Sequence, residues 1–236
     1  MKIQDATLLV TGAARGLGAA FVREAIARGA RKVYAGARDP SRVDIDGAVP
    51  VRLDVRDPAG IAAAASLWGD VTLVVNNAGI AGVSRLLDDG GSESLREHLE
   101  TNFFGMLEVS RHFAPVLKAN GGGGLLNVLS VVSFAHSPVL SAYSLSKTAA
   151  WGLTNALRNE LRPQGTQVLA LHVGFIDTDM TRGFDAPKLP PALVAQRAFD
   201  ALEEGASEVM ADEPARLVKS LLSNPAAPYL VPLGAG

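Results

Sequence analysis

Three side chains in the middle of the sequence have the types and spacing for proton transfer to an oxygen atom. Tyr143 precedes Lys147 by four residues, about one helical turn, so the ammonium would lie beside the phenol. This charge favours the phenolate and should lower the pKa of Tyr143, which is about 10 in an isolated tyrosine. Ser130 offers a second hydroxyl from another element. We expect both hydroxyls to donate to a substrate oxygen that gains negative charge.

A glycine-rich loop near the N-terminus could hold an anion. Gly12, Gly16 and Gly18 follow an apolar run and open a helical pattern. Glycine lets the backbone turn sharply and approach a ligand, while the first N–H groups of a helix carry a partial positive charge. The loop therefore predicts a pyrophosphate cradle, although such loops also occur as purely structural turns.

The residues after the second apolar run bear on which dinucleotide would fit. A carboxylate there would bind a ribose 2′-hydroxyl, but the sequence has Ala37 and then Arg38. Arg38 and Arg15 suit a phosphate on that ribose, which favours NADP(H) and leaves NAD(H) possible. Asp39 would reverse this preference if the strand ended two residues later.

The elements that must position these residues alternate along the chain. Short, uniformly apolar runs fit strands that are buried on both faces of a parallel sheet, and longer patterns between them fit helices. The sequence thus predicts an α/β fold, a doubly wound, mostly parallel, Rossmann-like sheet of about seven strands with helices on both faces. The expected strands are 7–10, 32–35, 49–53, 72–75, 125–129, 168–172 and 208–210, and the expected helices are 16–28, 58–68, 92–118, 142–161, 191–204 and 214–222.

Length and composition narrow the classes of function. The 236 residues, 48% hydrophobic and 19% charged, predict one domain over 1–236. A net charge of -2 gives no basic field for nucleic acid or acidic lipid. The absence of cysteine and the four scattered histidines predict neither disulfides nor a metal site. The apolar run Ala6–Val10 is too short for a signal peptide or a membrane span, so we expect a cytoplasmic protein.

Taken together, these motifs resemble the short-chain dehydrogenase/reductase family. The glycine loop, Asn76-Asn77-Ala78-Gly79, Asn102, Ser130 and the Tyr143–Lys147 pair occur in the family's order and at its usual spacing. Ser130 lies thirteen residues before Tyr143, and this spacing selects it over Ser133. The match runs through nearly the whole chain.

The resemblance implies a role for each residue of the reacting end. Tyr143 would be the acid/base in hydride transfer between nicotinamide and a carbonyl or alcohol carbon. Ser130 would orient and polarise the substrate oxygen, and Lys147 would hold the nicotinamide ribose and tune Tyr143. Asn102 would hold a water that links Lys147 to solvent, unless it is packed only for structure.

The resemblance also implies the other cofactor contacts. Val173 stands where the family usually has proline, so the turn after the sixth strand should be slightly looser, but Gly174 is kept. The expected cofactor-binding residues are Gly12, Arg15, Gly16, Leu17, Gly18, Arg38, Asp54, Val55, Asn76, Ala78, Gly79, Tyr143, Lys147, Gly174, Ile176 and Thr178.

The segment at about 179–190 resembles the family's substrate lid. With Val132, Phe134, Val139 and Phe175 it would form a mostly apolar pocket, so we expect an uncharged aldehyde or ketone, unless Arg85 and Arg182 point inward. The apolar face of the Tyr143 helix predicts a homodimer or homotetramer, or else a face that covers the sheet.

Two other functions remain open at this point. One is an NAD(H)-dependent alcohol dehydrogenase that uses the same residues. The other is a catalytically silent dinucleotide-binding sensor, which would not need Asn102, Ser130, Tyr143 and Lys147 together. The physiological substrate, the reaction direction and the stereochemistry are not determined by the sequence.

Overall fold

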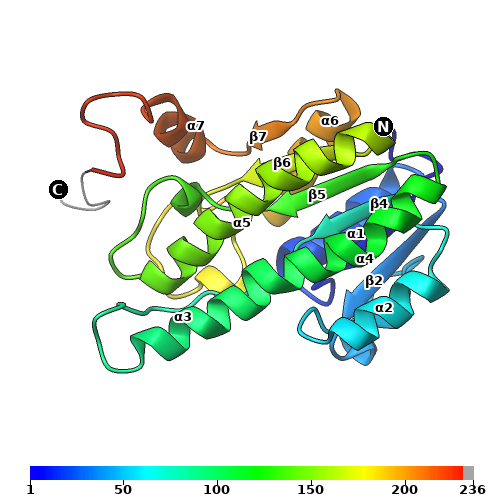
Figure 1. Ribbon diagram of the computed structural model, residues 1–236, viewed down its shortest axis with the longest axis horizontal. Coiled ribbons are helices and arrows are strands. Elements are labelled where there is room, and N and C mark those ends of the chain that lie inside the picture. Colours follow the sequence, from blue (N-terminus) through cyan, green and yellow to red (C-terminus); the bar gives the residue numbers. More distant parts are fainter. Residues whose placement is uncertain (231–236) are drawn as a thin grey trace.

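The computed structural model describes residues 1–230 and shows one twisted sheet with helices on both faces (Figure 1). The strand order is β3-β2-β1-β4-β5-β6-β7, and all neighbouring strands are parallel. This confirms the predicted doubly wound α/β architecture. The strands are β1 (Thr7–Thr11), β2 (Lys32–Ala37), β3 (Val49–Arg52), β4 (Leu73–Asn76), β5 (Gly124–Val128), β6 (Gln167–His172) and β7 (Glu208–Met210).

The position of each strand in the sheet explains its composition. Every residue of the central strands β1, β4 and β5 is buried, because helices cover both faces. The edge strand β3 is largely exposed and contains Pro50 and Arg52. Proline is tolerated there since an edge strand has fewer ladder hydrogen bonds to make.

Two apolar cores lie on opposite faces of the sheet. On one face Phe21 of α1 packs against Phe199 of α6, with ring centroids 5.3 Å apart. On the other face Trp68, which follows α2, stacks on both Tyr34 of β2 and Phe113 of α4. The helices are α1 (Gly16–Ala27), α2 (Pro58–Leu67), α3 (Gly91–Leu99), α4 (Gly105–Ala119), α5 (Ser141–Leu161), α6 (Pro191–Glu203) and α7 (Glu213–Ser220).

The segment predicted as a helix over 92–118 is helical throughout, but it is not a single α-helix. A π-helical turn, Glu100–Phe104, separates α3 from α4 and contains Asn102. A π turn has one more residue than an α turn and is frequent at functional sites. Here it turns the amide of Asn102 out of the helix and towards Ile80 and Ser146.

The connections of the sheet create a crevice between β1 and β4. The chain builds β1, β2 and β3 outwards in one direction and then returns to place β4 on the other side of β1. Loops that leave β1 and β4 at their carboxyl ends therefore diverge, which is where open α/β sheets bind ligands. None of the helices in residues 1–230 has both the length and the apolar character that a membrane span requires.

Candidate active site

A cavity opens at the carboxyl ends of β1, β4, β5 and β6. Four residues expected to bind a cofactor, Arg38, Asp54, Val55 and Asn76, are not part of its wall. The predicted residues that line it are Gly12, Arg15, Gly16, Leu17, Gly18, Ala78, Gly79, Tyr143, Lys147, Gly174, Ile176 and Thr178.

The glycine loop forms one end of the cavity, and packing requires its glycines. Gly12 has a left-handed φ of 67°, and a methyl group on it would lie 2.9 Å from the Ala78 Cα. A methyl group on Gly18 would collide with the Gly12 carbonyl oxygen. Helix α1 begins at Gly16 without a side-chain cap from Arg15, so its first N–H groups are left for a ligand. The loop thus fits an anion such as a pyrophosphate.

Thr11 and Asn77 fasten this loop to the end of β4. Thr11 Oγ1 accepts hydrogen bonds from the backbone N–H groups of Asn77 and Ala78, at 3.0 and 2.9 Å. Asn77 Nδ2 donates to the carbonyl oxygens of Thr11 and Gly12, at 2.9 and 3.2 Å. Asn77 also lines the cavity, although only its neighbours Asn76, Ala78 and Gly79 were predicted to do so.

The expectation for Asn76 needs correction, because its side chain lies inside the protein. Asn76 is the last residue of β4 and pairs with Asn127 of β5. Its Nδ2 donates to Ser110 Oγ at 3.0 Å and to Asn127 Oδ1 at 2.9 Å. Since side chains alternate along a strand, Asn76 faces α4 and cannot contact a ligand in the cavity through its amide.

Tyr143 lines the other end of the cavity, and Ser130 lies beside it but is not part of the wall. Tyr143 lies in the first turn of α5 and lines the cavity, while Ser130 follows β5 and caps a short 3₁₀ turn. Burial raises the pKa of Tyr143 to about 12, and the neighbouring Ser130 hydroxyl partly offsets this rise. Ser130 Oγ also donates to the Val173 carbonyl at 3.3 Å. The two hydroxyls therefore lie close together, as the sequence predicted.

Lys147 lies beside Tyr143 but does not lower its pKa as we expected. The Lys147 Nζ is 5.8 Å from the centre of the Tyr143 ring and donates to the Val128 carbonyl at 2.8 Å. Burial lowers the pKa of Lys147 to about 8. Desolvation thus dominates at both residues, favouring the neutral form of the phenol and of the amine.

Asn102 joins the π turn to the loop after β4 and to α5, although it does not itself line the cavity. Its Oδ1 accepts from Ile80 N at 2.8 Å, and its Nδ2 donates to Ile80 O and Ser146 Oγ, each at 2.9 Å. Ser146 in turn donates to the Tyr143 carbonyl at 2.7 Å. A methyl group on Gly79 would lie 3.1 Å from Asn102 Oδ1 and 3.7 Å from Lys147 Nζ. The glycine therefore lets these groups converge.

The turn after β6 closes the cavity wall. Val173 is buried, and its carbonyl accepts from Ser130 Oγ and from Val131 N. Gly174 N donates to Asp212 Oδ2 at 2.6 Å. These bonds hold the turn even though it lacks the expected proline. Thr178 approaches the glycine loop from this side, because a methyl group on Gly16 would lie 3.2 Å from Thr178 Cγ2.

The residues expected to choose between dinucleotides lie at the rim or beyond it. Arg38 is exposed just after β2, which ends at Ala37. Arg15 forms an ion pair with Asp179 at 3.1 Å, so its charge is already shared. Asp39 accepts hydrogen bonds from Ser41 N and Oγ, at 3.1 and 2.6 Å, and caps the following turn.

Asp54 and Val55, predicted at the adenine, also have contacts of their own. Asp54 Oδ1 accepts from Arg56 N at 2.9 Å, which forms a tight turn after β3. Val55 is buried against Gly105, where a methyl group would lie 2.8 Å from its Cγ2. The structure places both residues at the carboxyl end of β3, outside the wall of the cavity.

Comparisons with known proteins agree with this geometry. A short chain dehydrogenase from Burkholderia cenocepacia, solved in complex with NADP, is 37% identical, with a TM-score of 0.92 over 95% of each chain. A Streptomyces avermitilis short-chain dehydrogenase is 27% identical, with a TM-score of 0.81 over 90% of each chain.

Curated relatives match the sequence at similar levels. A 3-alpha-(or 20-beta)-hydroxysteroid dehydrogenase of Mycobacterium tuberculosis is 33% identical over 73% of this chain and 70% of its own length. The short chain dehydrogenase tazN of Aspergillus terreus is 35% identical over 81% of this chain, but the match spans only 45% of that relative. The family model described as short chain dehydrogenase matches residues 6–188. Both the sequence and the cavity therefore show that this chain belongs to the short-chain dehydrogenase/reductase family of oxidoreductases.

Proposed function

We propose that the protein is an NADP(H)-dependent oxidoreductase that reduces an uncharged aldehyde or ketone, or oxidises the matching alcohol. One observation carries this proposal. The phenol of Tyr143, the hydroxyl of Ser130 and the ammonium of Lys147 gather at one end of a cavity whose other end is a glycine loop at a helix N-terminus. A binding module without activity would not need the first three groups.

Tyr143 is the proton donor in the reducing direction. When bound, the dinucleotide supplies the hydride. Tyr143 Oη gives its proton to the substrate oxygen as the carbonyl carbon accepts that hydride, so the product is the alcohol. Because the pKa of Tyr143 is raised to about 12, the phenol carries this proton at neutral pH. Ser130 Oγ, which donates to the Val173 carbonyl in this structure, would turn its proton to the same oxygen and stabilise the developing charge.

Lys147 and Asn102 support the transfer. Lys147 would bind the nicotinamide ribose and return a proton to Tyr143. Asn102 fixes the backbone of Ile80 beside Lys147 through two hydrogen bonds and, with a bound water, would complete the proton relay. The burial of Lys147 and Asn102 supports this assignment, since neither polar group faces bulk solvent.

The preference for NADP(H) is supported by the end of β2. Asp39 is engaged by Ser41, whose hydroxyl lowers the pKa of the Asp39 carboxyl. Arg38 is the first residue after the strand, and its side chain is exposed. A guanidinium suits a 2′-phosphate, and a carboxylate occupied as a cap is poorly placed to accept from a 2′-hydroxyl.

The mouth of the cavity supports an uncharged substrate. Arg182 is paired with Asp179, and Arg85 is exposed. Met180 lines the cavity and is itself half exposed, and Val139 is exposed four residues before Tyr143. A substrate with an apolar body fits these side chains better than a carboxylate does.

We also propose a homodimer or homotetramer in the cytoplasm. The outward face of α5 includes the exposed small residues Gly152 and Ala156, and Leu145 and Leu153 are only partly buried. Small residues allow another helix to approach closely. Gly152→Leu should halve the mass measured by light scattering at micromolar concentration. A wild-type protein with the mass of one chain would contradict the proposal.

The test of the proposed function is a panel of neutral aldehydes and ketones with NADPH and with NADH. We expect reduction of at least one apolar carbonyl compound and a higher kcat/KM with NADPH. A higher kcat/KM with NADH would favour the NAD(H)-dependent alcohol dehydrogenase. Tight NADPH binding without turnover of any carbonyl or alcohol would favour the catalytically silent sensor.

A further inference from the structure

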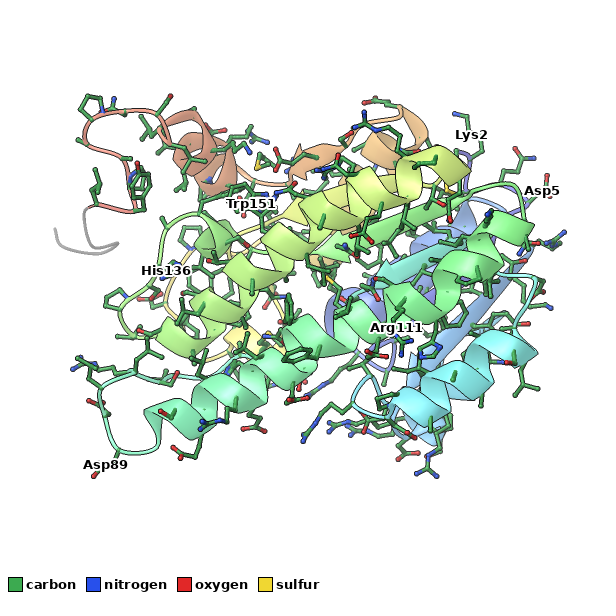
Figure 2. The ribbon with its side chains drawn as sticks, in the orientation of Figure 1. Lys2, Asp5, Asp89, Arg111, His136 and Trp151 are labelled. Carbon is green, nitrogen blue, oxygen red and sulfur yellow. The ribbon has the colours of Figure 1, made fainter. Side chains whose placement is uncertain are left out.

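A buried histidine lies directly behind Ser130. His172 is the last residue of β6 and is fully buried. Its Nδ1 is 3.3 Å from the Ser130 carbonyl oxygen. The ring stacks on Phe134 at a centroid distance of 4.2 Å and meets the edge of Trp151. Figure 2 shows Trp151 on the side of α5 that faces α7.

The other ring nitrogen faces a carboxylate. His172 Nε2 lies 3.2 Å from Glu208 Oε1, an ion-pair distance, but without the angle of a good hydrogen bond. Glu208 Oε2 lies 2.9 Å from Lys219 Nζ of α7. Burial alone would raise the pKa of Glu208, but the neighbouring His172 and Lys219 lower it to about 2. The carboxylate is therefore ionised at neutral pH.

Acceptors at both nitrogens favour a cationic ring. A neutral imidazole has one N–H and would turn a lone pair towards either the Ser130 carbonyl or Glu208. An imidazolium has a donor for each. The ionised Glu208 balances this charge, and the stacked Phe134 ring lies over it. The charged groups in contact with this cluster are Glu208 on β7 and Lys219 on α7.

His172 is placed to fix Ser130 from behind. Its ring reaches the Ser130 carbonyl, and the next residue, Val173, accepts the Ser130 hydroxyl. The last residue of β6 and the residue after it thus contact both polar groups of this serine. Glu208 and Lys219 lie beyond residues 6–188, the part that the family model matches. This support therefore comes from the C-terminal part of the chain.

We propose that His172 is a positioning residue, an imidazolium that is held by Glu208 and that orients the Ser130 peptide. Through this contact, β7 and α7 influence the reacting end of the cavity. The inference rests on the proposed function only where it predicts an effect of His172 on turnover. The charge state of the ring is a property of the fold and can be measured without a substrate.

The first test is nitrogen NMR of the histidine rings at neutral pH. We expect both nitrogens of His172 to be protonated in the wild type, and the Glu208→Gln variant to hold a neutral ring. A neutral His172 in the wild type overturns the proposal whether or not the protein turns over any carbonyl compound. The measurement therefore separates this proposal from the proposed function.

The second test is the pH dependence of kcat. In Glu208→Gln we expect kcat to fall about tenfold at neutral pH, the cost of one displaced hydrogen bond. Lower pH should restore it, while the NADPH affinity changes little. A wild-type kcat and pH profile in this variant overturn the proposal.

A matched pair of variants separates positioning from packing. His172→Phe keeps a stacked ring but removes both nitrogens, and should lower kcat about tenfold without restoration at low pH. His112→Phe removes a histidine that also lies near a glutamate, Glu108 at 3.5 Å, but on the surface of α4. It should leave kcat unchanged. Equal effects of the two variants would contradict a specific role for His172.

Discussion

The wall of the cavity and its rim differ in how strongly packing fixes them. In the wall, Gly12 and Gly18 have no room for a methyl group, and Lys147 is buried. At the rim, Arg15 has 69% of its side chain exposed, and Arg38 and Met180 are exposed as well. The difference indicates that packing constrains the residues of the wall, whereas the exposed side chains of the rim can be replaced with little effect on stability.

The strongest test of the packed wall is Gly18→Ala. Its methyl group would collide with the Gly12 carbonyl, a backbone atom that cannot move without opening the loop. We expect unfolding free energy to fall by ~3 kcal/mol and NADPH binding to be lost, measured by denaturant titration and calorimetry. Gly183→Ala is the control, because open space surrounds that glycine. Normal NADPH affinity in Gly18→Ala would show that the wall is not rigid.

The second prediction concerns the pH dependence set by burial in the wall. Because the pKa of Lys147 is lowered to about 8, the ammonium is present below that pH and is lost above it. Tyr143 keeps its proton, since burial raises its pKa to about 12. We therefore expect kcat/KM for reduction to fall about tenfold per pH unit above pH 8. Lys118→Met, on the surface of α4, should show the same profile, whereas a flat profile to pH 10 in the wild type would refute this role of Lys147.

The third prediction addresses the rim. Arg38→Ala should raise the KM for NADPH about tenfold through the loss of one charged hydrogen bond, and leave the KM for NADH unchanged. Arg111→Ala, which removes a charge paired with Glu108 on α4, is the control. Steady-state kinetics with both dinucleotides measure the effect. Equal changes for NADPH and NADH would place the selectivity elsewhere.

The smallest effect is expected far from the cavity. Lys32 of β2 forms an ion pair with Asp70 at 2.7 Å, and both side chains are more than a third exposed. Asp70→Asn should lower the unfolding free energy by ~0.5 kcal/mol and leave kcat and KM unchanged, since solvent screens such a pair. A clear loss of activity would show that the wall depends on this remote edge of the sheet.

Much of the fold was predictable because buried strands and helix faces have an apolar composition that can be recognised in the sequence. Strands covered on both faces are mostly apolar, and β1 and β5 follow this rule except at Thr7, Thr11 and Asn127. The π turn was not predictable, because it depends on hydrogen bonds from Asn102 to Ile80 and Ser146, which are distant in the sequence. Local propensity over 92–118 favours one continuous helix.

Motif spacing was enough to predict which residues of the site come together. It was not enough to predict which way a side chain points, because a shift of one residue changes that direction. Tyr143, Ser130 and Lys147 come together as expected. Asn76 and Asn77 differ by one residue, and the strand end at Asn76 turns the first into the core and the second into the cavity. The direction of the Tyr143 pKa shift was also missed, because sequence spacing shows a nearby charge but not the extent of burial.

Replacing Tyr143 by phenylalanine tests the central claim most directly. The variant keeps the ring and removes the proton donor, while Tyr229→Phe removes an exposed phenol elsewhere as a control. We predict that kcat for carbonyl reduction falls about a hundredfold or more in Tyr143→Phe, with NADPH affinity nearly unchanged, and that Tyr229→Phe behaves as the wild type. Undiminished turnover by Tyr143→Phe would contradict the account.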